Sequence, residues 1–154
     1  MADSSFIGRR LSQGKVAVEP GRLRFFAQAV GETDPVYTDA AAAGEAGHPA
    51  LPVPPTFLFC LNSEVAELGQ ILDTLQLDLG RILHAEQAFD YHRMAYAGDT
   101  LHFETRVADV YDKKGGALHF VVQETRVDNQ RGEHVADLRC TIVERRGLGG
   151  PDHA

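Results

Sequence analysis

The chain has 154 residues, of which 44% are hydrophobic and 24% are charged, and its formal charge is −7. This length fits one soluble globular domain, and the acidic balance argues against nucleic acid or an anionic membrane as the main partner. The two cysteines, Cys60 and Cys140, form neither a disulfide framework nor a zinc-ligand spacing and fit a reducing compartment. Without a secretory signal or an apolar stretch of about 18 residues, the chain is expected to be cytoplasmic and not membrane-bound.

The first half of the chain follows a helical period. Apolar side chains recur at i, i+3, i+4 and i+7 between Pro20 and Val30, which predicts a short amphipathic helix. A helical turn is predicted from Asp39, as N-cap, to Ala46. The apolar run after Pro54 is too wide for one helical stripe, so we predict a helix buried on most sides, from Pro55 to Leu68. Residues 70–79 fit a helix and a strand equally well.

After Gly80 the hydrophobic period changes to two, which is typical of strands. Glycine-containing turns separate the apolar segments, so successive strands should form antiparallel hairpins. A nearly all-apolar helix must be covered, and one sheet curled around it is the economical arrangement. We therefore predict the α+β class, with one antiparallel sheet wrapped around a long central helix. The predicted strands cover residues 81–93, 100–112, 117–127 and 134–145.

We assign residues 1–146 to this single domain and expect residues 147–154 to form a disordered tail. In the third predicted strand, the apolar side chains alternate and define one face. His119 falls on the opposite face, where we expect a surface position. The residues of the apolar face are Leu118, Phe120 and Val122.

Two segments carry candidate chemistry. Residues 31–39 hold three carboxylates and one phenol, and alone they fit solvated turn chemistry, because Asp-Pro initiates turns and acidic side chains are common in loops. Pro54 and Pro55 stiffen the approach to the buried helix, whose first turn offers unpaired backbone N–H groups to a carbonyl or an anion. Alone, these prolines equally fit ordinary helix initiation.

Together, these segments resemble the MaoC-like hot-dog-fold enoyl-thioester hydratases and 3-hydroxyacyl-thioester dehydratases, in particular the amino-terminal, FAS1-like branch. The resemblance covers about residues 6–145, and it implies a hot-dog fold that pairs with a second copy or with a related subunit. It is carried by residues 25–39, Pro54–Phe57, Tyr91–Arg93 and Ala97–Leu101.

The family's hydratase motif can be transferred position by position. In G-D-x-N-P-x-H, the Asp and the His hold and activate a water that adds to the double bond. Here Glu32 corresponds to the Asp, Asp34 to the Asn and Tyr37 to the His, while Pro35 is retained. A phenol has an ordinary pKa of about 10, so Tyr37 cannot do the work of a histidine near neutral pH. His84, on the first strand after Gly80, is a candidate to replace it.

The resemblance implies a hydratase or dehydratase of enoyl or 3-hydroxyacyl thioesters of coenzyme A or an acyl carrier, working as a homodimer or higher homo-oligomer. The alternative is a catalytically silent subunit that shapes the acyl channel for a hot-dog partner with an intact motif, in a heterodimer. A thioesterase on the same fold is a weaker alternative. The candidate catalytic residues are Glu32, Asp34, Tyr37 and His84.

Substrate binding is expected at the start of the buried helix and at one strand end, where a cation can meet a phosphate. We expect no cofactor. We also expect no metal site, because no pair of histidines shows the short sequence spacing of a local site. The candidate substrate-binding residues are Pro54, Pro55, Thr56, Phe57 and Arg93.

Overall fold

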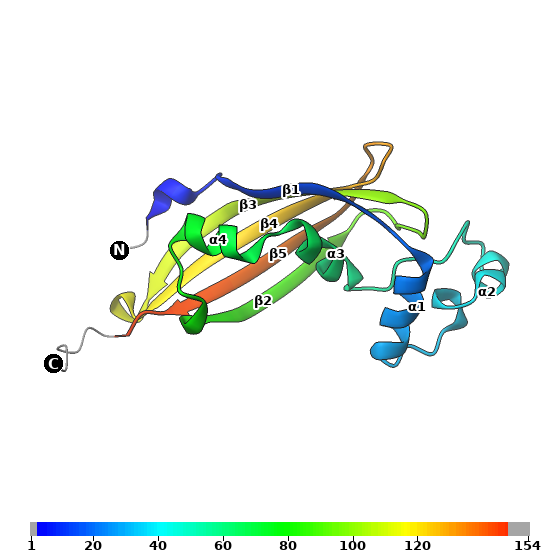
Figure 1. Cartoon of the computed structure of the whole chain (residues 1–154), viewed down its shortest axis with the longest axis horizontal. Helices are drawn as coiled ribbons and strands as arrows, with labels where there is room; N and C mark the ends of the chain where they lie inside the picture. The colour runs from blue at the N-terminus through cyan, green and yellow to red at the C-terminus, as the bar shows by residue number, and fades with distance from the viewer. Residues whose placement is uncertain (1–2, 148–154) are drawn as a thin grey trace.

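The computed structural model describes residues 3–147, so most of the tail expected at 147–154 lies outside the described residues. Five strands form one antiparallel sheet in the order β1-β3-β4-β5-β2 (Figure 1). The strands are β1 (Arg10–Ala17), β2 (Ile82–Tyr91), β3 (Thr100–Lys113), β4 (Leu118–Asp128) and β5 (His134–Arg145). The helices of the described part are α1 (Pro20–Ala29), α2 (Ala40–Glu45), α3 (Phe57–Val65) and α4 (Leu68–Leu75), with short 3-10 turns at Ser4–Phe6, Pro35–Tyr37, Leu79–Arg81 and Lys114–Gly116.

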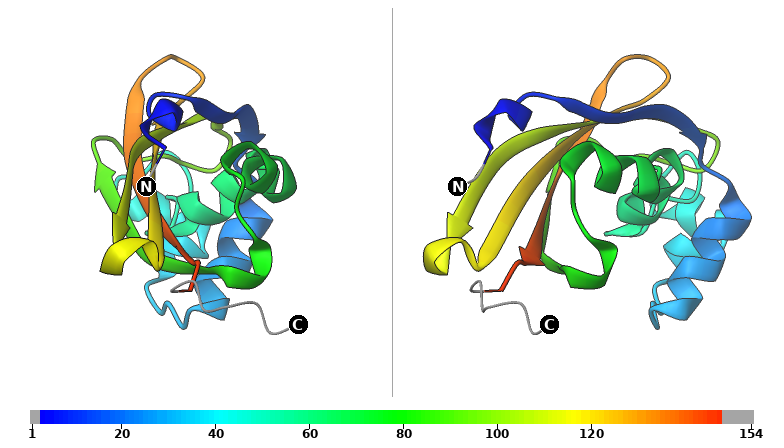
Figure 2. Two further views of the ribbon diagram at one scale, coloured as in Figure 1. Left: turned by 90° about the vertical axis from the view of Figure 1, so that its left-hand side faces the viewer. Right: turned by 60° about the vertical axis from the view of Figure 1, so that its left-hand side comes forward.

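The sheet curves around α3 and α4, as both panels of Figure 2 show, while α1 and α2 lie beyond one end of the sheet. The main core joins Leu58 and Leu61 of α3 to Phe103 of β3 and Leu138 of β5, all of them almost completely buried. The antiparallel sheet and its strands β2 to β5 were predicted from the period-two pattern, but the edge strand β1 was not predicted. The helical period predicted α1, and the N-cap predicted the start of α2 at Asp39. Within residues 3–147, no helix is long and apolar enough to cross a membrane.

The central helix is shorter than predicted. We expected one helix from Pro55 to Leu68, but α3 begins at Phe57 and ends at Val65. Ala66 and Glu67 adopt extended backbone, and the chain then turns into α4. The break has a physical cause, because the apolar face of α4 packs into a second core cluster against β3 and β4. That cluster contains Ile71, Leu72, Leu75, Val107, Val110 and Val121.

The expected surface position of His119 is wrong. Its side chain is buried, and its Nδ1 lies 2.7 Å from Oδ1 of Asp112 on the neighbouring strand. Both faces of β4 carry apolar side chains, since Phe120 stacks on Tyr111 on the outer face at 4.8 Å between ring centroids. Alternation alone therefore identifies two faces but not which of them meets the helices. The helix-facing residues of β4 include Val121, Thr125 and Val127.

The β2 edge of the sheet is the more open one. β2 pairs only with β5, and most of its side chains are exposed. Helix α3 lies closest to the opposite edge of the sheet, where it contacts β1. A cavity of about 390 Å³ consequently lies between the two helices and the β2 side of the sheet, lined by residues such as Phe59, Ile71, His84 and Leu138.

Candidate active site

The acidic loop, residues 31–39, follows directly from the end of α1. Gly31 takes a positive φ of 75°, and the Glu32 N–H returns to the Ala27 carbonyl at 2.8 Å, which closes the helix. Oε1 of Glu32 accepts hydrogen bonds from the N–H groups of Thr33 and Asp34, at 2.8 and 2.9 Å. One oxygen of this candidate base is thus committed to the backbone of its own loop.

The Asp34 carboxylate also accepts a hydrogen bond from the backbone of its own loop. Its Oδ1 accepts from the Val36 N–H at 3.1 Å and caps the short 3-10 turn that carries Tyr37. Pro35 starts this turn with a backbone angle that suits it. The carboxylates of Glu32 and Asp34 therefore fix the conformation of the loop, and both residues are exposed.

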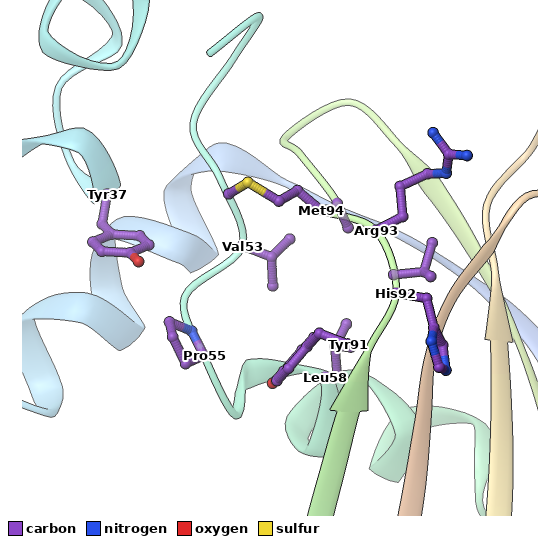
Figure 3. Close-up of a pocket in the computed structure, with 10 residues that line it drawn as sticks. Tyr37, Val53, Pro55, Leu58, Tyr91, His92, Arg93 and Met94 are labelled. Carbon is purple, nitrogen blue, oxygen red and sulfur yellow. The ribbon is translucent and has the colours of Figure 1, made fainter. Parts of the chain in front are cut away.

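Tyr37 is the member of this loop that enters a cavity. The cavity measures about 320 Å³, and Figure 3 shows the Tyr37 side chain at one side of it, across from Pro55 and Tyr91. Partial burial raises the pKa of Tyr37, and the negative charges of Glu32 and Asp34 raise it further. The phenol thus stays protonated near neutral pH and can donate a hydrogen bond, but it cannot take up a proton.

The start of α3 forms a second side of the cavity. Pro55 lines it, whereas Pro54 is buried behind it. Thr56 has a positive φ of 70°, which turns its N–H toward the Tyr91 hydroxyl, and that oxygen accepts the hydrogen bond at 2.9 Å. Tyr91 is a site residue missing from the sequence-based candidates, although it lies in the Tyr91–Arg93 segment that contributed to the family resemblance.

The remaining candidates lie apart from Tyr37. The ring of Phe57 packs on Phe26 with 4.8 Å between centroids, in a separate hollow beside α1. Arg93 is at the rim of the cavity, and Figure 3 shows its side chain directed away from Tyr37. Its Nη1 lies 3.6 Å from Oε1 of Glu133.

His84 is not among the residues that line the Tyr37 cavity. Its ring stacks on Phe59 with 5.5 Å between centroids, and its Nε2 lies 3.0 Å from the Glu86 carbonyl oxygen and 3.6 Å from Sγ of Cys140. Burial raises the pKa of Cys140 to about 11, so this thiol remains protonated. Within one chain, His84 therefore belongs to the apolar cavity between the helices and the sheet rather than to the acidic loop.

Comparison with known proteins places the chain in a family. Residues 5–138 match the family model described as "FAS1-like, dehydratase domain region". The chain belongs to the FAS1-like dehydratase family. A "UPF0336 protein" of Streptomyces coelicolor is 36% identical over 147 residues, which is 93% of this chain and 95% of that protein.

Solved structures of related proteins confirm the hot-dog fold for this FAS1-like dehydratase family member. One is the C-terminally truncated HadBC (3R)-hydroxyacyl-ACP dehydratase complex of Mycobacterium tuberculosis, with a TM-score of 0.76 and 27% identity, over 90% of this chain and 96% of that one. Another is a "MaoC-like dehydratase" with a TM-score of 0.81 and 24% identity. The match covers 92% of this chain and 42% of that one. The family resemblance seen in the sequence is thereby confirmed.

Proposed function

We propose that the chain is the acyl-binding half of a hydratase or dehydratase of enoyl or 3-hydroxyacyl thioesters, and that a second hot-dog subunit supplies the catalytic acid and base. The observation that supports this assignment is the state of Tyr37. A phenol with a raised pKa stands where the family motif has an imidazole, and one oxygen of the adjacent Glu32 carboxylate is engaged by two backbone N–H groups.

The chemistry explains why this matters. Dehydration of a 3-hydroxyacyl thioester removes a proton from the carbon next to the carbonyl and delivers a proton to the departing hydroxyl. Negative charge develops on the thioester oxygen and needs hydrogen-bond donors. The Tyr37 phenol stays protonated near neutral pH, and the N–H groups of Thr56 and Phe57 at the start of α3 are already donated to the Tyr91 hydroxyl and the Pro54 carbonyl. In this proposal, the partner subunit therefore supplies the proton-transfer groups.

The acyl chain has an apolar path available. Three hollows follow one another beside α3: the Tyr37 cavity, a hollow that includes Thr56 and Phe89, and the 390 Å³ cavity under α4. The second and third share Phe59, His84 and Gln87, and Tyr91 of the first stacks on Phe89 of the second at 5.9 Å. We call these three hollows the acyl groove. In this proposal, His84 lines the groove and has no role in proton transfer.

The exposed surface favours a partner at the same place. Several large apolar side chains along the acyl groove and its edge strand are about half exposed, which is unusual for a surface that remains in water. A second subunit covering them would close the groove and bring its own residues to the Tyr37 cavity. HadBC, which is related in sequence and fold, is a (3R)-hydroxyacyl-ACP dehydratase complex. The exposed side chains are Phe59, Leu68, Leu83, Tyr91 and Met94.

The test compares the chain alone with the chain in complex. We expect the purified chain to bind an acyl thioester without hydrating crotonyl-CoA, and to support turnover once it is co-expressed with a hot-dog subunit that has the intact G-D-x-N-P-x-H motif. In that complex, changing the partner's motif His should abolish turnover, whereas Glu32→Gln in this chain should leave most of it.

Two results would assign the other functions. Hydration of crotonyl-CoA by the chain alone, lost in Glu32→Gln and Asp34→Asn, would make it an independent hydratase with the acidic loop as its catalytic centre. Release of free thiol from acyl-CoA, without change at the double bond, would make it a thioesterase. Either result would contradict the division of roles proposed above.

A further inference from the structure

Three potential metal ligands from two strands converge beyond the end of β2. His92 directly follows β2, while His134 and Asp137 lie on β5. Nε2 of His92 is 2.8 Å from Oδ2 of Asp137, and Nε2 of His134 is 2.9 Å from Oδ1 of the same carboxylate. The two imidazole rings are 4.3 Å apart between centroids, and one ligand atom from each residue lies within 4.8 Å of the other two.

The backbone holds this arrangement in place. The His92 N–H donates to the Val135 carbonyl at 2.9 Å, which fixes the segment after β2 against β5. All three side chains remain partly exposed, so an ion from solvent can reach them. His92 also lines the Tyr37 cavity, but Figure 3 shows its imidazole directed away from Tyr37, so the cluster lies at the edge of that cavity.

The local charge also favours a cation. Asp90 of β2 is the register partner of Asp137 across the β2–β5 pair, so two carboxylates stand directly opposite each other. Like charges in such a cross-strand pair repel. Arg126, the register partner of Asp137 on the other side, supplies positive charge but is itself paired with Asp128 at 2.8 Å.

We propose that His92, His134 and Asp137 form a binding site for a divalent transition-metal ion, with zinc as the representative ion. Two imidazole nitrogens and one carboxylate oxygen are ligands that zinc accepts, at about 2.0–2.2 Å each. Both Nε2 atoms already point at one carboxylate, so an ion that replaces the two hydrogen bonds needs only small side-chain movements. Each imidazole would then carry its proton on Nδ1.

Three protein ligands leave at least one coordination position for water. Bound metal would also tie the segment after β2 to β5, because the ligands come from both. Since His92 and the following residues Arg93 and Met94 line the Tyr37 cavity, the ion would stabilise one side of that cavity. The proposal does not depend on the function assigned to the acyl groove.

The test uses the full chain without a polyhistidine tag, titrated with ZnCl2 in a calorimeter and with CoCl2 in an absorption spectrometer. We expect one saturable site per chain and the visible absorption bands of Co²⁺ bound by nitrogen and oxygen. His134→Gln and Asp137→Asn should each weaken zinc binding by more than the roughly 10- to 100-fold lost when a residue that only hydrogen-bonds to a metal ligand is changed. His102→Gln removes a histidine from β3, two strands from His134 and not one of the three ligands, and is the matched control that should bind as the wild type does.

A second readout guards against variants that fold poorly. Saturating zinc should raise the Tm of the wild type and of His102→Gln, but not the Tm of His134→Gln or Asp137→Asn. Absence of saturable binding by the wild type would overturn the proposal. Equal zinc affinity in the wild type and both ligand variants would overturn it too, because the ion would then bind elsewhere.

Discussion

The N–H of Thr56 donates a hydrogen bond to the hydroxyl of Tyr91 across 2.9 Å, and this bond joins the start of α3 to the end of β2. Thr56 holds a positive φ of 70°, a backbone conformation that is uncommon for a threonine. The hydrogen bond lies between the Tyr37 cavity and the next hollow of the acyl groove. It therefore holds the start of α3 against the end of β2 at the wall between these two hollows.

Replacing this hydroxyl gives the first prediction. Tyr91→Phe keeps the ring and its stacking on Phe89 but removes the acceptor of the Thr56 N–H. We expect a loss of about 1 kcal/mol in the free energy of unfolding, the usual value of one hydrogen bond. Urea denaturation measures it. Tyr111→Phe keeps the stacking of Tyr111 on Phe120 and is the control; an equal loss in both variants would show that the Thr56 contact contributes nothing.

The buried His119 of β4 and the partly buried Asp112 of β3 give a prediction about acid stability. The hydrogen bond from His119 lowers the pKa of Asp112, an effect that burial partly opposes. Because the folded-state pKa lies below the unfolded value of about 3.9, this carboxylate contributes stability above that pH, and the contribution disappears as the pH falls through the folded-state pKa. The Tm difference between the wild type and Asp112→Asn should thus shrink below about pH 4. A difference that stays constant from pH 7 to pH 3 would contradict the assignment.

Much of the fold follows from local chemistry. The turn from Asp39 into α2 was predictable because an aspartate that caps two backbone N–H groups favours a helix start in almost any context. The strands from Thr100 to Arg145 were predictable because the period of two persists over three consecutive segments. The break after Val65 was not predictable from local sequence. The extended backbone at Ala66 and Glu67 is stabilised by the packing of α4 on a distant part of the sheet.

The site was only partly predictable for the same reason. The motif positions identified Tyr37, but the sequence could not show that the Glu32 and Asp34 carboxylates bind the backbone of their own loop. Nor could the spacing of histidines show the proximity of His92 and His134, because these residues are 42 positions apart and meet only through the β2–β5 pairing. Properties that depend on strand pairing are visible only once the register is known.

The environment of Cys140 leads to a prediction about thiol reactivity. Burial raises the pKa of Cys140 to about 11, and the thiolate is the reactive form. In a Cys60→Ser variant, where Cys140 is the one remaining cysteine, alkylation by iodoacetamide should be slow at pH 7 and should keep accelerating up to about pH 11. A rate that levels off near pH 9 would instead indicate an ordinary, solvated thiol. Mass spectrometry of quenched samples gives the rate at each pH.

Restoring the family motif provides a direct test of why the chain should be inactive alone. Glu32→Asp, Asp34→Asn and Tyr37→His together recreate G-D-x-N-P-x-H in this loop. The imidazole would then occupy the place of the Tyr37 phenol at the cavity wall, where it can exchange protons near neutral pH. We expect the triple variant to hydrate crotonyl-CoA at least about 100-fold faster than the wild-type chain alone, the lower end of what a positioned acid–base group contributes.

The control for this gain is Tyr37→Phe, which removes the phenol without adding an imidazole. It should leave the chain alone as inactive as the wild type, and a complex with a catalytic hot-dog partner should keep most of its turnover. Strong loss of turnover in that complex would instead make the Tyr37 hydroxyl a catalytic group. Because Asp34 caps the turn that carries Tyr37, circular dichroism of the triple variant must show that the loop changes leave the fold intact. An intact triple variant without activity would mean that the missing imidazole is not what keeps this chain from acting alone.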